Sequence, residues 1–147
     1  MFLPRPFLAL TAAVLLASGA ASSSVAAGPA SPVGVWMTGD NHGLVEVYAC
    51  GARLCGKILT SDQLKADPSL KDTENKDPAL RGRPLKGLVF MTGFAGGPPR
   101  WTGGSLYRPS NGSLYQGSIE MTDANTLKLK GCIVAPLCAN QVWTRAR

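Results

Sequence analysis

From residue 34 onward the chain consists of short segments in which apolar and polar residues alternate, separated by turn-forming residues. In Val45 to Ala49, for example, apolar residues alternate with glutamate and tyrosine. A period of two is typical of a strand with one buried face, and no helical period extends beyond a turn or two. Eight strands are therefore predicted, near residues 34–38, 43–50, 54–60, 86–92, 101–108, 113–121, 125–132 and 139–145.

The segments between these strands are mostly short and rich in Asp, Asn, Gly and Pro. Residues 40–43, 109–112 and 123–125 have the composition of tight turns. Short turns between consecutive strands favour an antiparallel up-and-down meander, and eight such strands can close into a small barrel without exposed edges. The predicted fold class is therefore all-β, with a lipocalin-like barrel preferred and a β-sandwich left open.

The N-terminus has the organisation of a secretory signal peptide. Arg5 precedes the apolar run Leu8 to Leu16, which is followed by small residues up to Ala30. The apolar run is shorter than the roughly 20 residues that a membrane span needs. We therefore expect residues 1–27 to be removed, residues 28–147 to form one domain, and the mature protein to be periplasmic or secreted without a membrane span.

The charge of the mature chain does not indicate a polyanionic partner. Arg5 is the only charged residue before Asp40, so removal of the signal lowers the formal charge from +6 to +5. The basic residues are scattered along the sequence rather than clustered, which is typical of a solvated surface. No nucleic-acid partner is predicted.

Four cysteines in an exported chain indicate two disulfides, for which three connectivities exist. Each pair of neighbouring cysteines brackets a turn, so local bonds are preferred: Cys50 with Cys55, and Cys132 with Cys138. If the members of each pair lie directly opposite in a hairpin, both disulfides fall on the outer face of the barrel. The intervals between the cysteines do not match the C-x2-C pairs of a zinc ribbon, so no metal site is predicted.

The polar segment 61–84 interrupts the meander and contains three prolines, with helical turns expected near 62–65 and 78–81. A loop of this length in a compact domain is often functional or mobile. Its oxygen ligands could suit calcium, but the spacing of a calcium loop is absent and turn and cap roles are preferred. These residues are Asp67, Asp72, Glu74, Asn75 and Asp77.

Two arginines at alternate positions near the end of this segment, Arg81 and Arg83, have two interpretations. With Lys86 and Arg100 they could form an anion-binding rim. Alternatively, they pair with acidic residues of the same segment and fasten it to the barrel, which is the preferred interpretation.

Candidate catalytic residues are few. His42 is the only histidine, and Asp40 is its only neighbour along the chain that could be a partner. No serine lies in a nucleophile-elbow sequence. The sequence therefore predicts neither an enzyme nor a cofactor.

Several motifs distributed over most of the chain resemble one family of exported bacterial proteins, domain of unknown function 2147. The motifs are Gly34-Val-Trp36, Val45 to Gly51, Leu54 to Ile58, Asp72 to Asn75, Asp77-Pro78, Leu80 to Leu85, Trp101-x-Gly103-Gly104 with Tyr107, and Trp143-Thr144-Arg145. The resemblance implies export and a lipocalin-like β architecture, and no reaction.

The Gly-x-Trp sequence in the first strand is also similar to that of the lipocalins. In that family a basic residue from the last strand packs over the tryptophan and closes one end of the barrel. Trp36 and Arg145 occupy the matching positions, so the resemblance implies a closing contact between them.

Two functions remain open on this basis. The first is a barrel that binds a small apolar or amphipathic ligand through Phe94 and Trp101, with the flexible-looking segment 93–99 bordering its mouth. By default, such aromatic residues belong to the core or the barrel wall. The alternative is a non-enzymatic protein with a filled barrel that binds a cell-envelope component. A regular meander further predicts that the loop 61–84 covers the closed end and that the mouth lies beside residues 51–54.

Overall fold

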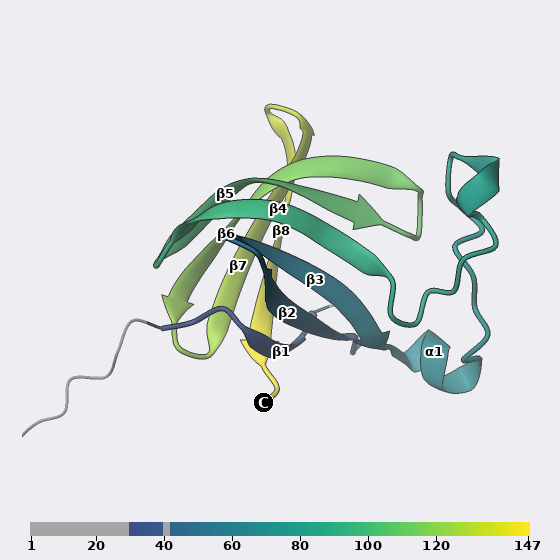
Figure 1. Cartoon of the computed structure of the whole chain (residues 1–147), viewed down its shortest axis with the longest axis horizontal. Coiled ribbons are helices and arrows are strands. Elements are labelled where there is room, and N and C mark those ends of the chain that lie inside the picture. Colours follow the sequence, from purple (N-terminus) through teal and green to yellow (C-terminus); the bar gives the residue numbers. More distant parts are fainter. Residues whose placement is uncertain (1–29, 40–41) are drawn as a thin grey trace, which may run out of the picture.

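The computed structural model describes residues 30–39 and 42–147, which form a closed barrel of eight antiparallel strands in consecutive order (Figure 1). The last strand pairs with the first, so the sheet has no free edge. The all-β, lipocalin-like prediction is confirmed, and the sandwich alternative is wrong. The predicted signal peptide and the turn residues Asp40 and Asn41 lie outside the described residues.

The strands are close to their predicted positions except for the fourth. Their bounds are β1 Gly34–Met37, β2 Leu44–Cys50, β3 Arg53–Thr60, β4 Val89–Gly97, β5 Arg100–Arg108, β6 Ser113–Asp123, β7 Thr126–Val134 and β8 Leu137–Arg145. Two short helices, α1 Asp62–Ala66 and the 3-10 helix η1 Pro78–Leu80, lie in the long connection between β3 and β4, where helical turns were predicted.

The prediction that residues 93–99 form a flexible loop is wrong, because β4 extends through Gly97. Ala95, Gly96 and Gly97 pair with residues of β5, and only the two prolines are left to make the turn. The side chain of Phe94 is completely buried in the core, which draws this glycine-rich segment into the barrel wall.

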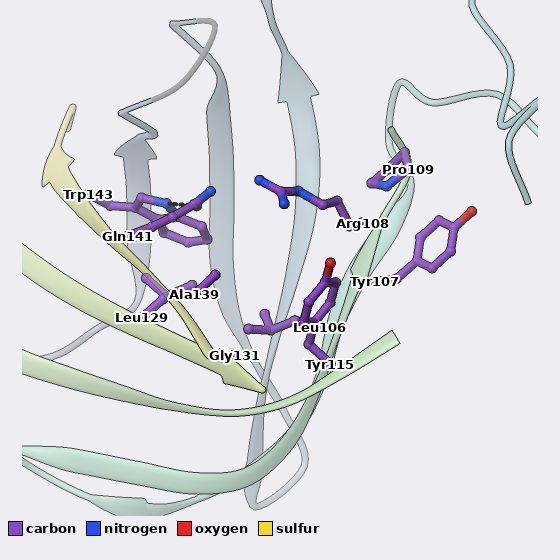
Figure 2. A pocket seen from close by; sticks show the side chains of 10 residues that line it. All are labelled: Leu106, Tyr107, Arg108, Pro109, Tyr115, Leu129, Gly131, Ala139, Gln141 and Trp143. Atoms are coloured by element: carbon purple, nitrogen blue, oxygen red, sulfur yellow. Dashed lines mark hydrogen bonds between the residues drawn. The ribbon is translucent and has the colours of Figure 1, made fainter. Parts of the chain in front are cut away.

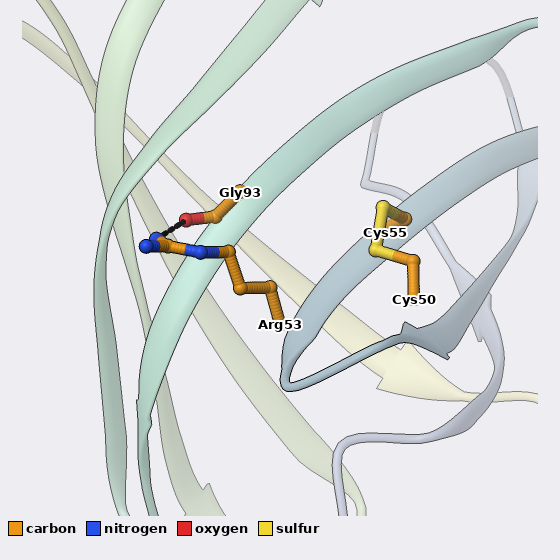
Figure 3. The surroundings of a disulfide bond; sticks show 4 residues. All are labelled: Cys50, Arg53, Cys55 and Gly93. Atoms are coloured by element: carbon orange, nitrogen blue, oxygen red, sulfur yellow. Dashed lines mark hydrogen bonds between the residues drawn. A yellow bond between two sulfur atoms is a disulfide. The ribbon is translucent and has the colours of Figure 1, made fainter.

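Both disulfides join neighbouring cysteines, as preferred from the sequence, but only one register is as predicted. Cys132 lies opposite Cys138. In the other hairpin Cys50 lies opposite Arg53, and Cys55 lies opposite Tyr48, so the predicted register is wrong by two residues. The first disulfide crosses the hairpin diagonally with a Cα–Cα distance of 5.9 Å (Figure 3). A shift of two preserves the alternation of faces, so the inward positions remain as expected.

Apolar side chains fill much of the barrel interior. The core contains Trp36, Val45, Val47, Leu54, Met91, Phe94, Trp101, Ile119, Met121, Leu127, Leu129 and Trp143. The hypothesis of a filled barrel expects such a core, whereas the ligand-binding hypothesis needs unfilled space. The position of the space that these side chains leave therefore decides between the two hypotheses.

The two ends of the barrel differ in the segments that they bring together. The closed end carries residues 30–33, the turns at 51–52, 98–99 and 124–125, and the C-terminus. The open end carries the β1–β2 turn, the long loop (residues 61–88), the β5–β6 turn at 109–112 and the β7–β8 turn at 135–136. In Figure 1, α1 and the rest of the long loop extend beyond the ends of β3 and β4.

Candidate functional site

The closed end is built around Arg145 and Trp36. The guanidinium carbon of Arg145 lies 4.2 Å from the centre of the Trp36 ring, so the contact implied by the lipocalin resemblance is present. All three guanidinium nitrogens donate to backbone carbonyls: Nε to Ala124 (2.7 Å), Nη1 to Val33 (3.1 Å) and Nη2 to Ser31 (2.7 Å). The arginine therefore ties the first described residues, the β6–β7 turn and the indole together.

Gly34 explains why glycine precedes the tryptophan at this end. A Cβ atom at Gly34 would lie 2.6 Å from Nη1 of Arg145 and 3.2 Å from the carbonyl oxygen of Arg147. Its φ of +144° is also one that other residues rarely adopt. The Gly-x-Trp sequence thus supplies both the ring and the space that the guanidinium needs.

The long loop lies at the end opposite this closure, so the prediction that it covers the closed end is wrong. Although Trp36 is close in sequence to the β1–β2 turn, it pairs with Arg145, the last residue of β8. Strands in a barrel are tilted and staggered, and the short β1 meets only the final part of β8. The predicted mouth beside residues 51–54 is therefore at the closed end.

At the open end a cavity of about 130 Å³ enters the barrel between β5 and β8. Figure 2 shows ten residues around it: Leu106, Tyr107, Arg108, Pro109, Tyr115, Leu129, Gly131, Ala139, Gln141 and Trp143. Leu129 and Trp143 form its buried floor, and Gln141 accepts a hydrogen bond from the Trp143 indole (3.1 Å). The walls are mostly apolar.

Arg108 brings a positive charge to the rim of this cavity. Its side chain extends toward the cavity, whereas that of Tyr107 points away from it (Figure 2). None of the ion pairs among residues 30–39 and 42–147 involves Arg108. A hydrogen bond from Asn111, together with the nearby charges of Arg108 and Lys76, lowers the pKa of Tyr115. The rim is therefore electropositive.

A second, wider hollow of about 240 Å³ lies between this rim and the long loop. It shares Arg108, Pro109 and Gln141 with the inner cavity. Side chains of the long loop, among them Leu64 and Leu70, form its other wall. The inner cavity and this outer hollow together give an apolar interior with a polar, partly loop-covered entrance.

The long loop is held by Asp72, whose carboxylate is buried. Tyr107 donates to one carboxylate oxygen (2.6 Å), while Asn75 and Nε of Arg83 both donate to the other (2.8 Å each). Burial alone would raise the pKa of Asp72, but the hydrogen bonds from Tyr107, Asn75 and Arg83 outweigh it, and the pKa is lowered. The loop is thereby fixed to the outer wall of β5.

The arginines named from the sequence do not assemble into an anion-binding rim. Arg83 pairs with Asp72, and Nε of Arg81 donates to the carbonyl of Asn75 (2.7 Å). Arg100 pairs with Glu120 (2.6 Å) at the closed end. Lys86 is exposed in the long loop. The contacts of Arg81 and Arg83 are those expected of loop-fastening residues.

The acidic residues of the loop have local partners. Asp77 caps η1 by accepting from Ala79 (2.9 Å), and Asp67 accepts from Ser69. Glu74 is exposed. Among the residues that the structure describes, no three His, Cys, Asp or Glu side chains are placed to hold a metal ion. No helix in this part of the chain is long and apolar enough to span a membrane.

Phe94 and Trp101, the residues predicted to bind a ligand, lie in the core rather than on the cavity wall. Phe94 is completely buried and Trp101 nearly so. Neither residue lines the cavity or the outer hollow. The prediction of a binding role depended on interpreting residues 93–99 as a mouth loop, whereas the burial of both rings agrees with the default position of aromatic residues in the core or wall.

His42 has a partner that its sequence neighbourhood did not suggest. Its Nδ1 lies 2.8 Å from Oδ2 of Asp62, at the start of α1, and both side chains are exposed. The hydrogen bond with His42 lowers the pKa of Asp62. The pair joins the β1–β2 turn to the long loop on the surface.

Sequence reasoning did not single out Arg108, although a signal was present. Gly104, Leu106 and Arg108 occupy alternate positions on β5, so a period of two places all three on the inner face. A charged residue at an inward-facing position near the end of a strand indicates that the apolar core stops there and that the barrel opens to solvent.

Comparison with known proteins agrees with this geometry. A solved structure, "Protein HP1028 from the human pathogen Helicobacter pylori belongs to the lipocalin family", superposes with a TM-score of 0.73 at 19% sequence identity, covering 80% of this chain and 84% of that chain. No match was found among curated proteins. The profile of a family described as "Uncharacterized protein conserved in bacteria (DUF2147)" matches residues 34–145. With its strands, disulfides and motifs inside that match, the chain belongs to the DUF2147 family.

Proposed function

We propose that the barrel binds a small amphipathic molecule through its open end, with an apolar group in the inner cavity and a polar group at Arg108. The observation that carries this proposal is an apolar cavity that opens at one end of the barrel and has a cation at its rim. Binding sites for small molecules commonly combine apolar walls with a few polar groups that fix orientation.

The volume of the inner cavity limits the apolar group. A cavity of about 150 Å³ lined by apolar side chains can hold a benzene molecule, and the inner cavity here is about 130 Å³. The proposed ligand therefore places one aromatic ring or a short alkyl chain inside. The remainder occupies the outer hollow of about 240 Å³ below the long loop.

The charge at the rim favours an anionic ligand. Arg108 extends toward the cavity, and Lys76 of the long loop contacts Ser113 (3.4 Å) beside the β5–β6 turn. A guanidinium presents several donors in one plane, which suits a carboxylate, phosphate or sulfonate. This arrangement supports an acidic amphiphile as the class of ligand.

The proposal places this binding outside the cytoplasm. Two disulfides suit an oxidising compartment, and the organisation of residues 1–27 is that of a cleaved signal. We propose that the working protein begins near Gly28 and is periplasmic or secreted. The intact mass of protein purified from its own envelope tests this start site.

Two dyes that share an aromatic nucleus test the binding proposal. Anilinonaphthalene sulfonate is anionic, and phenylnaphthylamine is its neutral parent. We expect both to gain fluorescence with the protein, and Ala139→Leu to weaken both by about tenfold or more, because the added side chain occupies the cavity. Thr144→Leu introduces the same side chain on the outer face of β8, and as the control it should change neither affinity.

Arg108→Gln separates the polar from the apolar part of the site. It should weaken the anionic dye by about fivefold to tenfold and leave the neutral dye nearly unchanged, because only the former gains from the guanidinium. If the unmodified protein binds neither dye, or if Ala139→Leu and Thr144→Leu bind equally, the barrel acts as a filled scaffold and the cavity is not a binding site.

A further inference from the structure

The tip of the β7–β8 hairpin is an apolar surface with no partner in the barrel. Ile133, Val134 and Leu137 are 58%, 67% and 71% exposed, and Ala135 and Pro136 between them are also exposed. Five consecutive apolar residues at the end of a projecting hairpin are unusual for a solvated surface. In Figure 1 this tip stands clear of the other strands.

We call this surface the apolar tip and define it as residues 133–137. The pairing of β7 with β6 ends at Cys132, which lies opposite Gln116, so the tip projects beyond the neighbouring strand. The Cys132–Cys138 disulfide lies directly at the base of the tip and holds the two strands together there. The apolar residues are therefore presented by a fixed support.

The strands behind the apolar tip carry only positive charge. No acidic residue occurs from Ala124 to the end of the chain. Of the basic residues there, Arg145 and Arg147 lie at the closed end, and Lys128 and Lys130 lie nearer the tip. Lys130 is exposed two residues before the disulfide, opposite Ser118 on one side and Asn140 on the other. A cationic support behind an apolar tip complements a surface with anionic groups outside and an apolar interior.

We propose that the apolar tip inserts into the surface of a lipid bilayer that contains anionic headgroups, with Lys130 at headgroup level. Apolar side chains at such a boundary gain by leaving water, and nearby Lys and Arg gain by attraction to anionic lipids. A second copy of the chain could also cover the apolar residues, but it would bring two cationic hairpins together. A lipid surface is therefore the preferred partner.

The apolar tip lies at the open end of the barrel, directly beyond the cavity. Gly131 and Ala139, which line the cavity, are the neighbours of Cys132 and Cys138. Docking through the tip therefore turns the cavity entrance toward the membrane. This interaction needs no cavity ligand, so its failure would leave the binding proposal unaffected, and the reverse also holds.

Flotation with lipid vesicles tests the inference on the mature chain. We expect the protein to float with vesicles of phosphatidylcholine mixed with phosphatidylglycerol, more weakly with phosphatidylcholine alone, and less as salt is raised. Val134→Ser combined with Leu137→Ser should weaken binding at least about tenfold, because both side chains lose their apolar contact with lipid. Val142→Ser is the matched control, since Val142 is an exposed valine further along β8, and it should bind like the unmodified protein.

Leu137→Trp adds a measurement of depth. The native Trp36, Trp101 and Trp143 are buried in the barrel, so quenching by brominated lipids should be seen mainly with the added tryptophan. Absence of vesicle binding by the unmodified protein, or equal binding by the tip and control variants, would overturn the inference. So would a dimer in solution that Val134→Ser with Leu137→Ser dissociates, because a second copy would then be the partner.

Discussion

The two ends of the barrel each place an arginine against an aromatic ring, but they use it differently. At the closed end Arg145 covers Trp36 inside the barrel, and its hydrogen bonds all go to backbone carbonyls. At the open end Arg83 lies 5.1 Å from the ring of Tyr107 on the outer wall and pairs with the Asp72 carboxylate. One contact closes the barrel, whereas the other holds a loop beside an opening.

This difference shows how a long loop can be firmly attached without blocking the cavity. Tyr107 points away from the cavity, so everything that fastens the loop through Asp72 acts on the outside of β5. The next residue, Arg108, extends toward the cavity. Adjacent positions on one strand therefore serve attachment and entrance, and the alternation of faces keeps the two functions apart.

The largest expected effect is at the closed end. Trp36→Ala should lower the free energy of unfolding by about 3–5 kcal/mol, because it removes a fully buried indole and the surface on which Arg145 rests. Chemical denaturation measures the loss. A cost below about 1 kcal/mol would mean that this end collapses around the gap and that its closure contributes little to stability.

At the open end the expected effect is smaller and local. Asp72→Asn should lower the free energy of opening the long loop by about 1–3 kcal/mol, because the neutral amide loses the charge that pairs with Arg83 and keeps a single acceptor oxygen where the carboxylate has two. Hydrogen exchange at the amides of Asp72 and Leu85, which donate to the carbonyls of Arg83 and Leu70, reports this opening. Asp67→Asn, in the same loop but exposed, is the matched control.

The pH dependence of the same variant sharpens the contrast between the ends. The pKa of Asp72 is lower in the folded than in the unfolded chain, so its contribution is complete above the unfolded value of about 3.9 and is lost as the pH falls through the folded pKa. Asp72→Asn should therefore lose less stability than the unmodified protein on acidification below about pH 4. Identical acid-side slopes would show that this carboxylate does not control the loop.

A double-mutant cycle measures the closing contact itself. Trp36→Phe and Arg145→Gln should be coupled by about 0.5–2 kcal/mol, because the larger indole face holds the guanidinium better than a phenyl ring does. Denaturation of the two single variants and the double variant gives the coupling. Strict additivity would mean that Arg145 acts only through its backbone carbonyls.

The smallest effect is expected for another arginine near the closed end. Arg100→Gln breaks an ion pair with Glu120 in which both side chains are substantially exposed, so the loss should be within about 0.2–1 kcal/mol. The loss in free energy of unfolding, measured at low and at high salt, should differ by less than this amount. If Arg100→Gln costs as much stability as Arg145→Gln, the contact of Arg145 with the Trp36 ring does not explain its contribution.

Alternation of apolar and polar residues was sufficient to predict the barrel, because each strand has one buried face. It was insufficient for the first hairpin, in which the turn controls the register. Gly51, with a φ of +64°, and Ala52 make a two-residue turn, which sets Cys50 opposite Arg53. The disulfide then reaches across the diagonal, a geometry that counting from the cysteines alone does not reveal.

The candidate site was harder to predict than the fold, because it depends on which end of the barrel is filled. Trp36 is near the β1–β2 turn in sequence, yet its pairing with Arg145 places the closure at the other end. That stagger between the first and last strands comes from the shear of the whole barrel and has no local sequence signal. The mouth, and therefore the proposed role of Arg108, could be located only from the closed structure.

The seam between β1 and β8 also bears on how the chain reaches its native state. The hydrogen bonds of Arg145 to Val33 and Ser31 join residues 112 and 114 positions apart, and the amide of Val35 donates to the carbonyl of Arg147 (3.1 Å). Contacts of such long range form late in folding, so the barrel is sealed only once the entire polypeptide has emerged. A circular permutant could link β8 to β1 and start at the Gly51–Ala52 turn. The pairing between β1 and β8 would then be local in sequence, so we expect it to form early in folding instead of late.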